Sequence, residues 1–188
     1  MSVASFTALT NPGYGSVLTG TVNVSAGDMI VLFGAYCSNQ SWTSGSDADG
    51  NTYVETKHSS ENELAFYIAT AASSNAALGV TLTMNTNRSS KDGWCLVISG
   101  GGTHVSTEES LNTGVTSHSM TSTSLTASGV VIGAVRIQGN SINISDGSTG
   151  WDDSNAPVYQ RIFAGYEERS TAKSGEIITT SAARDSDV

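Results

Sequence analysis

Apolar and polar residues alternate along several short stretches of this chain, which is the pattern of β-strands that bury one face. The clearest stretch covers 78–84, where leucine, valine and methionine alternate with glycine and threonine. Residues 64–68 alternate in the same way. Residues 29–37 are apolar at both alternating sets, which predicts a central strand covered on both faces, or on one face partly by a partner. The stretch 93–99 predicts another strongly apolar strand.

Turn-forming residues separate these stretches, and no stretch has the periodicity of a long amphipathic helix. The sequence therefore predicts an all-β fold, an antiparallel sandwich of two sheets with a jelly-roll-like strand order. We expect a single β-sandwich domain over 21–181. Residues 1–20 precede it as an N-terminal arm or first strand, and 182–188 follow it as a frayed tail.

The second half of the chain echoes the first. Residues 127–135 resemble 26–34, and 164–175 resemble 65–75. Two apolar strands about 100 residues apart, each followed by a tyrosine-bearing strand, favour an internal duplication. A jelly roll with two Greek keys in one double sheet fits this symmetry, and two separate small domains are the alternative.

Charge limits the partners that the chain can bind. Its 188 residues carry a formal net charge of −9, with only 8 lysines and arginines. So few cations cannot follow a phosphate backbone, and an acidic surface is repelled by anionic lipids, so we expect neither nucleic-acid nor membrane binding. Residues 1–10 lack the pattern of a secretory signal, and 29–37 is too short to span a bilayer, which predicts a soluble chain made in a cytoplasm.

Candidate catalytic or metal chemistry is sparse. The stretch 47–51, Asp-Ala-Asp-Gly-Asn, resembles the start of a calcium loop, but the twelfth position is His58 where a glutamate is needed, so an ordinary turn is favoured. The histidines lack metal-site spacing, and no serine stands in a nucleophile elbow. We expect no catalytic, cofactor-binding or metal-binding residue, and no enzyme.

Two cysteines and three loop aromatics leave alternatives open. Cys37 and Cys95 lie in apolar runs and are predicted to be small buried side chains, with a disulfide as the alternative if their strands adjoin. Trp42, Tyr53 and Trp151 lie in polar surroundings, where they either cap one end of the sheets or line a site for a sugar.

The order of four segments resembles a β-sandwich module common in bacteriophage structural proteins. These segments are Ala-Gly-Asp-Met-Ile-Val-Leu-Phe at 26–33, Ser-Asp-Ala-Asp-Gly-Asn-Thr-Tyr at 46–53, Ala-Phe-Tyr-Ile-Ala-Thr at 65–70 and Val-Thr-Leu-Thr at 80–83. The resemblance covers roughly 20–100, and the second half by repetition. Its motifs identify the fold more strongly than the role.

The resemblance implies a head decoration (cement) protein on the capsid surface of a virion, made in the host cytoplasm. Such a protein binds across neighbouring major capsid subunits and stabilises the shell, and a homo-oligomer, a trimer on a shell axis, is expected. Phe6, Leu9 and Tyr14 are the candidate docking arm, and deletion of 1–18 is expected to abolish shell binding and leave the fold intact. The alternative is a carbohydrate- or receptor-binding module of a tail fibre or adhesin, acting through Trp42, Tyr53 and Trp151.

Overall fold

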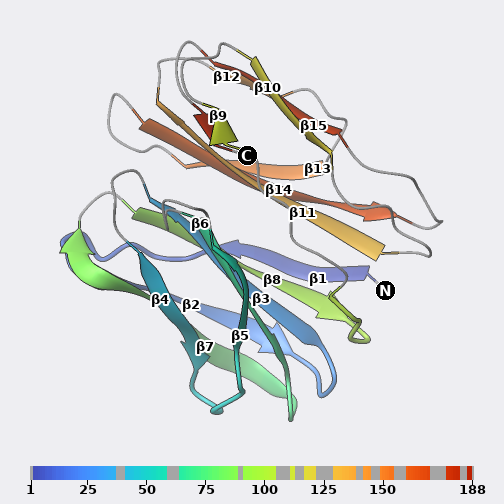
Figure 1. The fold of residues 1–188 in the computed structure, drawn as a ribbon. Helices are drawn as coiled ribbons and strands as arrows, with labels where there is room; N and C mark the ends of the chain where they lie inside the picture. The colour runs from blue at the N-terminus through green and yellow to red at the C-terminus, as the bar shows by residue number, and fades with distance from the viewer. Residues whose placement is uncertain are drawn as a thin grey trace. The chain divides into compact units, whose positions relative to one another are not determined.

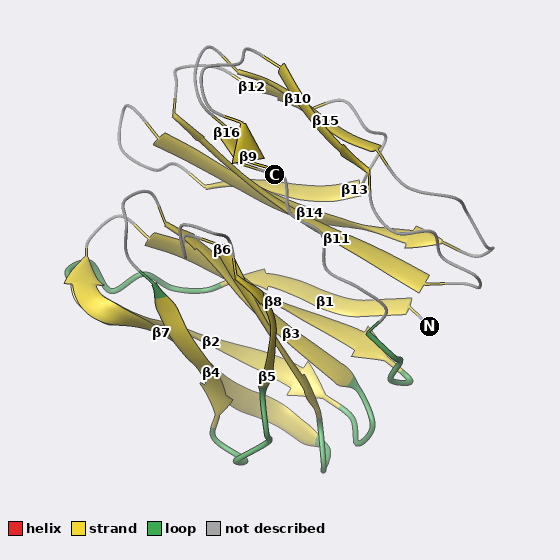
Figure 2. Cartoon of the chain, viewed as in Figure 1, coloured by secondary structure: helices red, strands yellow, loops and turns green. Residues whose placement is uncertain are grey.

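The computed structural model describes residues 2–36, 41–58, 64–88, 91–104, 111–112, 117–121, 129–138, 142–144, 149–154, 160–169, 177–182 and 186–187. Every regular element in these residues is a β-strand, which confirms the all-β prediction (Figure 2). The chain divides into two compact units, Met1–His104 and Val105–Val188, where the sequence predicted one domain over 21–181. We call them unit 1 and unit 2 and describe each by itself.

The described residues of unit 1 form eight strands (Figure 1). In chain order they are β1 (Ser2–Ala8), β2 (Gly15–Val24), β3 (Met29–Tyr36), β4 (Trp42–Asp47), β5 (Val54–His58), β6 (Leu64–Thr70), β7 (Asn75–Arg88) and β8 (Lys91–Ser99). They build a five-stranded sheet, β1-β8-β3-β6-β5, and a three-stranded sheet, β2-β7-β4.

The pairs of unit 1 are nested in the manner of a jelly roll. β1 pairs with β8, β2 with β7 and β3 with β6, all antiparallel. Strands β1 to β4 alternate between the two sheets, so each connection crosses the sandwich. β5 departs from the simple scheme, because it pairs with β6 at the edge of the larger sheet instead of joining β4. The predicted antiparallel sandwich with jelly-roll-like order is therefore confirmed.

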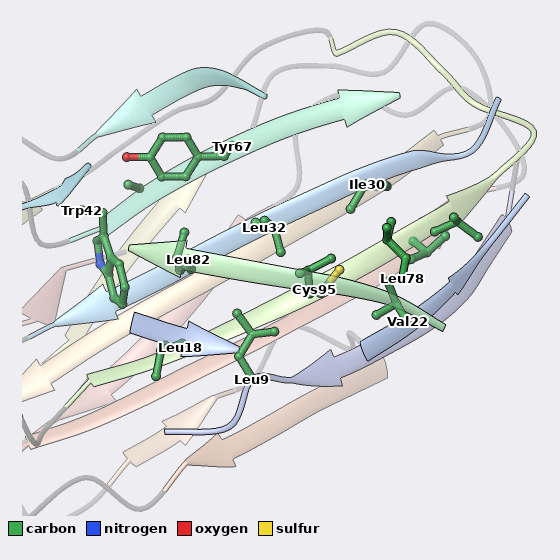
Figure 3. Packing of buried hydrophobic residues seen from close by; sticks show 14 of the residues in the cluster. Leu9, Leu18, Val22, Ile30, Leu32, Trp42, Tyr67, Leu78, Leu82 and Cys95 are labelled. Carbon is green, nitrogen blue, oxygen red and sulfur yellow. The ribbon is translucent and has the colours of Figure 1, made fainter. Parts of the chain in front are cut away.

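The core of unit 1 lies between its two sheets (Figure 3). β7 contributes Leu78, Val80, Leu82 and Met84, all buried, which confirms the alternation expected for 78–84. The opposite sheet contributes side chains such as Leu32, which is 0 % exposed. Each such aliphatic side chain stabilises the fold by about 1.5–3 kcal/mol on burial.

The five-stranded sheet has a second apolar face, formed by the other alternating set of residues. The ring of Phe33 lies at its centre, 0 % exposed. Its neighbours across the sheet are Phe6, Phe66 and Trp94, with ring centroids at 6.3, 5.2 and 5.6 Å. Stacked aromatic pairs at these distances stabilise beyond their buried area. Both alternating sets of β3 are buried, as the composition of 29–37 predicted.

Asp28 fixes the turn between β2 and β3. Its side chain is 5 % exposed and accepts backbone N–H bonds from Ser25 (2.8 Å) and Gly100 (3.1 Å). Gly27 precedes it with a φ of 87°, a conformation that favours glycine. The Gly-Asp dipeptide before the apolar run therefore has a structural role, joining this turn to the end of β8.

The described residues of unit 2 form β9 (Leu111–Asn112), β10 (Ser117–Thr121), β11 (Gly129–Gln138), β12 (Ile142–Ile144), β13 (Thr149–Ser154), β14 (Gln160–Arg169), β15 (Ile177–Ala182) and β16 (Ser186–Asp187). They build a five-stranded sheet, β13-β14-β11-β16-β9, and a three-stranded sheet, β10-β15-β12. All the pairs are antiparallel.

Unit 2 repeats the strand order of unit 1. Strands β9 to β16 take the places of β1 to β8 one by one in both sheets. The register agrees as well, because Tyr166 lies opposite Ile132 as Tyr67 lies opposite Leu32. The expected internal duplication is confirmed. Each half, however, has two sheets of its own, so the repeat is a pair of sandwich units and not two Greek keys of one double sheet.

Candidate functional site

The three residues expected in a docking arm have different environments. Phe6 lies on β1, within the five-stranded sheet, and stacks on Phe33. Leu9 is 7 % exposed in the core, and its N–H donates to the carbonyl of Gly93 (2.7 Å). Only Tyr14 is exposed, at 75 %. The first alternative for 1–20, a free arm, therefore does not apply to 2–8, which form the first strand.

Residues 11–14, which we call the Asn11 turn, connect β1 to β2 and are held by a buried lysine. The Lys91 ammonium, on a residue that is 0 % exposed, donates to Asn11 Oδ1 (2.9 Å) and to the carbonyls of Gly13 and Arg88 (2.8 Å each). Asn11 Nδ2 in turn donates a hydrogen bond to the backbone carbonyl of Lys91 (2.8 Å). Three acceptors match the three N–H bonds of a charged ammonium group.

The electrostatics of Lys91 fit a structural role. Burial lowers the pKa of Lys91 below its usual value of 10.5, and the carboxylate of Asp92 opposes this shift. The charge is stabilised by oxygen acceptors at close range, which offsets part of its desolvation cost. Lys91 thus holds the Asn11 turn at Asn11 and Gly13, and the exposed Tyr14 follows Gly13, whose φ is 93°.

The Asp-Ala-Asp-Gly-Asn stretch at 47–51 forms the turn that the sequence favoured. Asp47 Oδ1 accepts the N–H groups of Asp49 (3.0 Å) and Asn51 (3.1 Å), and its Oδ2 accepts from Asn51 Nδ2 and Tyr53 OH (2.9 Å each). Gly50 has a φ of 75°. Burial raises the pKa of Asp47, but these hydrogen bonds outweigh it and hold the pKa below its usual value of 3.8.

The side chains around this turn satisfy one another. The Asp49 carboxylate accepts from Asn75 Nδ2 (2.9 and 3.1 Å), and Asn51 Oδ1 accepts the N–H of Ala72 (3.0 Å). Within the part of the chain that the structure describes, no three carboxylate, histidine or cysteine side chains form a metal-binding group. The turn joins the β4–β5 connection to the β6–β7 connection, which is a structural role.

The three candidate ligand aromatics do not form one exposed cluster. Trp42 is the first residue of β4 and is 2 % exposed. Its ring contacts β3 at Gly34, where an added Cβ would lie 2.6 Å from Trp42 Cζ2. Tyr53 is half-buried, and its hydroxyl donates to Asp47. Trp151 lies on β13, and its side chain is outside the described residues.

Two further buried groups bear on the candidate chemistry. Cys95 is a free thiol with 0 % exposure, and burial raises its pKa to about 12, with Asp47 adding to the shift. Its candidate disulfide partner, Cys37, lies outside the described residues. Tyr67 OH is buried with no hydrogen-bond partner among the described residues. Burial, and then the charge of Glu55, raise the pKa of Tyr67.

Sequence reasoning missed the burial of Lys91 and Asp28, the two buried charged residues among those that the structure describes in unit 1. A signal existed for each, since each stands at the polar end of a strongly apolar run, Asp28 before 29–36 and Lys91 before 93–98. Charged residues at such positions usually lie in solvent, so the pattern alone does not distinguish the buried case.

The fold therefore defines the chain as a tandem pair of β-sandwich units with jelly-roll strand order. In the described residues, no helical segment has the length and hydropathy to cross a bilayer. Comparison of the chain with family models, with curated proteins and with solved structures gives no match.

Proposed function

We propose that this chain is a non-enzymatic decoration protein of a bacteriophage capsid, which binds across neighbouring major capsid subunits and stabilises the assembled shell. The observation that carries the proposal is the tandem repeat, two units with the same strand order in one chain. A repeated fold presents two related surfaces, and a shell presents identical subunits side by side. One chain can therefore bridge two subunits, and the second contact benefits from the high effective concentration set by the first.

Tyr14 is the candidate contact residue in this proposal. It is 75 % exposed, and the Lys91 bonds fix the turn that carries it. A large aromatic side chain on a rigid turn loses little conformational entropy on binding, which is typical of interface hot spots. Leu9 is buried and Phe6 stacks on Phe33, so we take Tyr14 as the contact residue to test first among the three that the sequence suggested.

Deletion of 1–18 is not a clean test of docking. It would remove β1 and the first residues of β2, together with the buried Leu9 and Leu18. Loss of binding would then report a damaged sandwich, contrary to the sequence-based expectation that the fold survives. A single exposed side chain gives the sharper experiment.

The test is co-sedimentation of the purified chain with empty shells of its source phage, compared with binding to unassembled capsid subunits. Bridging predicts at least about 100-fold tighter binding to assembled shells. Tyr14→Ala is expected to weaken shell binding by at least about 30-fold, since hot-spot truncation costs 2 kcal/mol or more. Val54→Ala is the matched control, because Val54 is the other large hydrophobic residue exposed in the described part of the chain, at 61 %, and is outside the Asn11 turn.

Equal affinity for shells and free subunits would refute the bridging mechanism, and failure to bind either would refute the decoration role. The carbohydrate-binding alternative would then be tested with a glycan array. Trp42, one of its three residues, is buried and cannot contact a sugar in this conformation. Trimerisation, virion location and the absence of enzymatic activity stay predictions.

A further inference from the structure

Lys91 and Asn11 bring together the first and last strands of unit 1. Lys91 is the first residue of β8, and Asn11 begins the turn that follows β1. β1 and β8 are neighbours in the five-stranded sheet (Figure 1). The two residues are 80 positions apart in the sequence, yet Lys91 Nζ lies 2.9 Å from Asn11 Oδ1. An amine, which is a nucleophile when neutral, therefore lies beside a carboxamide, whose carbon is an electrophile.

The carboxamide of Asn11 is held in one orientation. In addition to the Lys91 bond, its Oδ1 accepts the N–H of Gly13 (3.0 Å), and its Nδ2 donates to the backbone carbonyl of Lys91 (2.8 Å). The Gly13 N–H polarises the side-chain carbonyl, and it stabilises the negative charge that develops on Oδ1 when a nucleophile adds to Cγ. The Asn11 side chain is thus both fixed and activated toward addition.

The two other acceptors of Lys91 direct its amine toward Asn11. Nζ also donates to the carbonyls of Gly13 and Arg88 (2.8 Å each). A neutral amine has two N–H bonds and one lone pair. When Lys91 loses a proton and keeps these two bonds, its lone pair points at the third partner, the Asn11 carboxamide. Burial lowers the pKa of Lys91, which raises the neutral fraction, and at 0 % exposure water has little access to the amine.

We propose that Lys91 and Asn11 react in the folded chain to form an isopeptide bond between Lys91 Nζ and Asn11 Cγ. Nζ leaves its position beside Oδ1 and its lone pair adds to Cγ. One remaining amine proton passes to Nδ2, the bond from Cγ to Nδ2 breaks, and ammonia leaves. Ammonia binds the proton that the Lys91 ammonium released at the start, so the net products are one amide bond and one ammonium ion.

The reaction needs no oxidant, reductant or cofactor, only the contact between the two side chains. Holding two reacting groups together replaces a bimolecular encounter, and well-aligned groups reach effective concentrations of about 10⁵ M or more. The bond closes a covalent ring that contains β2 to β7. A cross-link over so long a segment stabilises mainly by lowering the conformational entropy of the unfolded chain. This inference does not depend on the decoration role.

A neighbouring proline removes the usual competing reaction of Asn11. An asparagine commonly loses ammonia when the backbone nitrogen of the next residue attacks its Cγ and forms a succinimide. The next residue here is Pro12, which has no N–H, so this route is closed. Loss of ammonia at Asn11 therefore reports attack by another nucleophile, and the amine in contact with its carboxamide is Lys91 Nζ.

The first experiment measures the intact mass of the purified full chain. We expect most molecules to be lighter than the sequence by one ammonia molecule. Incubation at alkaline pH, which increases the neutral fraction of Lys91, is expected to complete the reaction in the rest. Lys91→Met is the matched control, because methionine keeps an unbranched side chain and lacks the amine. This variant is expected to keep the full mass under both conditions.

The second experiment locates the bond by digestion with trypsin, which cuts after lysine and arginine but not after a lysine whose amine is acylated. Without the bond, trypsin releases 1–57 as a separate peptide and cuts after Lys91. With the bond, 1–57 is joined to an uncut peptide 89–136 in one branched product. Fragmentation of this product in the mass spectrometer is expected to place the link between Asn11 and Lys91.

Two results would overturn the proposal. The first is a parental chain that keeps its full mass after alkaline incubation, while Cys95 resists a thiol reagent and so shows that unit 1 is folded. The second is a loss of ammonia that persists in Lys91→Met or maps to a different asparagine, which would assign it to another reaction. The parental chain gives the first result by itself, so the proposal is tested even where Lys91→Met fails to fold.

Discussion

Gly34 offers the sharpest test of the packing in unit 1. It lies on β3, opposite Gly93 on β8, and faces the core. A Cβ at this position would lie 2.6 Å from Leu82 Cδ2 and 2.6 and 2.7 Å from two ring atoms of Trp42. An ordinary contact needs 3.4 Å or more, so both neighbours must withdraw by about 0.8 Å. Trp42 is 2 % exposed and rigid, which leaves it little room.

Gly34→Ala is therefore expected to destabilise unit 1. Overpacking of a tight core costs about 1–3 kcal/mol, and we place this site at the upper end because two rigid ring atoms are involved. Alanine also restricts the unfolded chain more than glycine does, which stabilises the folded state by about 0.4–1 kcal/mol and offsets part of this cost. The net expectation is a loss of about 2–2.5 kcal/mol in the free energy of unfolding, measured by urea denaturation followed through tryptophan fluorescence.

Gly79→Ala is the matched control, in the middle of β7. Among the described residues, apart from its chain neighbours, the only heavy atom within 4 Å of its added Cβ is Ala48 Cβ at 3.9 Å, an ordinary contact. Because there is no clash, the remaining effect is the lower conformational entropy of the unfolded chain. The variant is therefore expected to be more stable by about 0.4–1 kcal/mol. The two substitutions are chemically identical and should shift the urea midpoint in opposite directions. A Gly34→Ala protein as stable as the Gly79→Ala protein would show that Trp42 does not pack on β3 as described.

Two other variants and one labelling experiment test buried polar groups and the free thiol. Tyr53→Phe removes a donor to the Asp47 carboxylate, so the free energy of unfolding should fall by about 1–2 kcal/mol near neutral pH. Because the pKa of Asp47 is held below 3.8 in the folded chain, its stabilisation is present above that pH and is lost as the pH falls further, so parental and variant urea midpoints should converge in acid. Tyr67→Phe removes a buried hydroxyl with no described hydrogen-bond partner and should instead stabilise by about 1 kcal/mol; a loss equal to that of Tyr53→Phe would reveal a partner. Cys95, with its pKa raised to about 12 and no exposure, should resist a thiol reagent at pH 8 until urea unfolds unit 1, and rapid labelling of the native chain at this cysteine would contradict its burial.

Local patterns predict the apolar strands, but they predict neither the polar strand β4 nor the contacts between strands. The alternation at 78–84 predicts β7 because side-chain period is a local property. The duplication was also readable, since apolar runs recur along the chain. Trp42 was expected in a loop because its neighbours are polar, and nothing near it in sequence shows that it packs on Gly34. The burial of Lys91 was not predicted for the same reason. Its acceptors on Asn11 and Gly13 are far from it in the sequence and lie close to it only after folding.

The repeat itself offers an independent check on the pairing of Gly34 with Trp42. By the register of the two tyrosines, the equivalent of Gly34 in unit 2 is Ala134, and Ile142 begins β12 as Trp42 begins β4. The unit with the larger residue at the start of its fourth strand has glycine on its third strand, and the unit with the smaller residue has alanine. This is the relation expected if the two positions share one volume in the core.

A double-mutant cycle in unit 1 tests that relation directly. Trp42→Ile alone is expected to destabilise by about 3 kcal/mol or more, through lost burial and a cavity. In that background, Gly34→Ala has a methyl-sized space to fill and should no longer clash, so its cost should fall to zero or become a gain. The coupling energy should therefore be about 1–3 kcal/mol in favour of the double variant, as found for residues in direct contact. Strictly additive effects would mean that the two side chains do not compete for one space, and that the correspondence between the repeats at these positions is a coincidence of sequence.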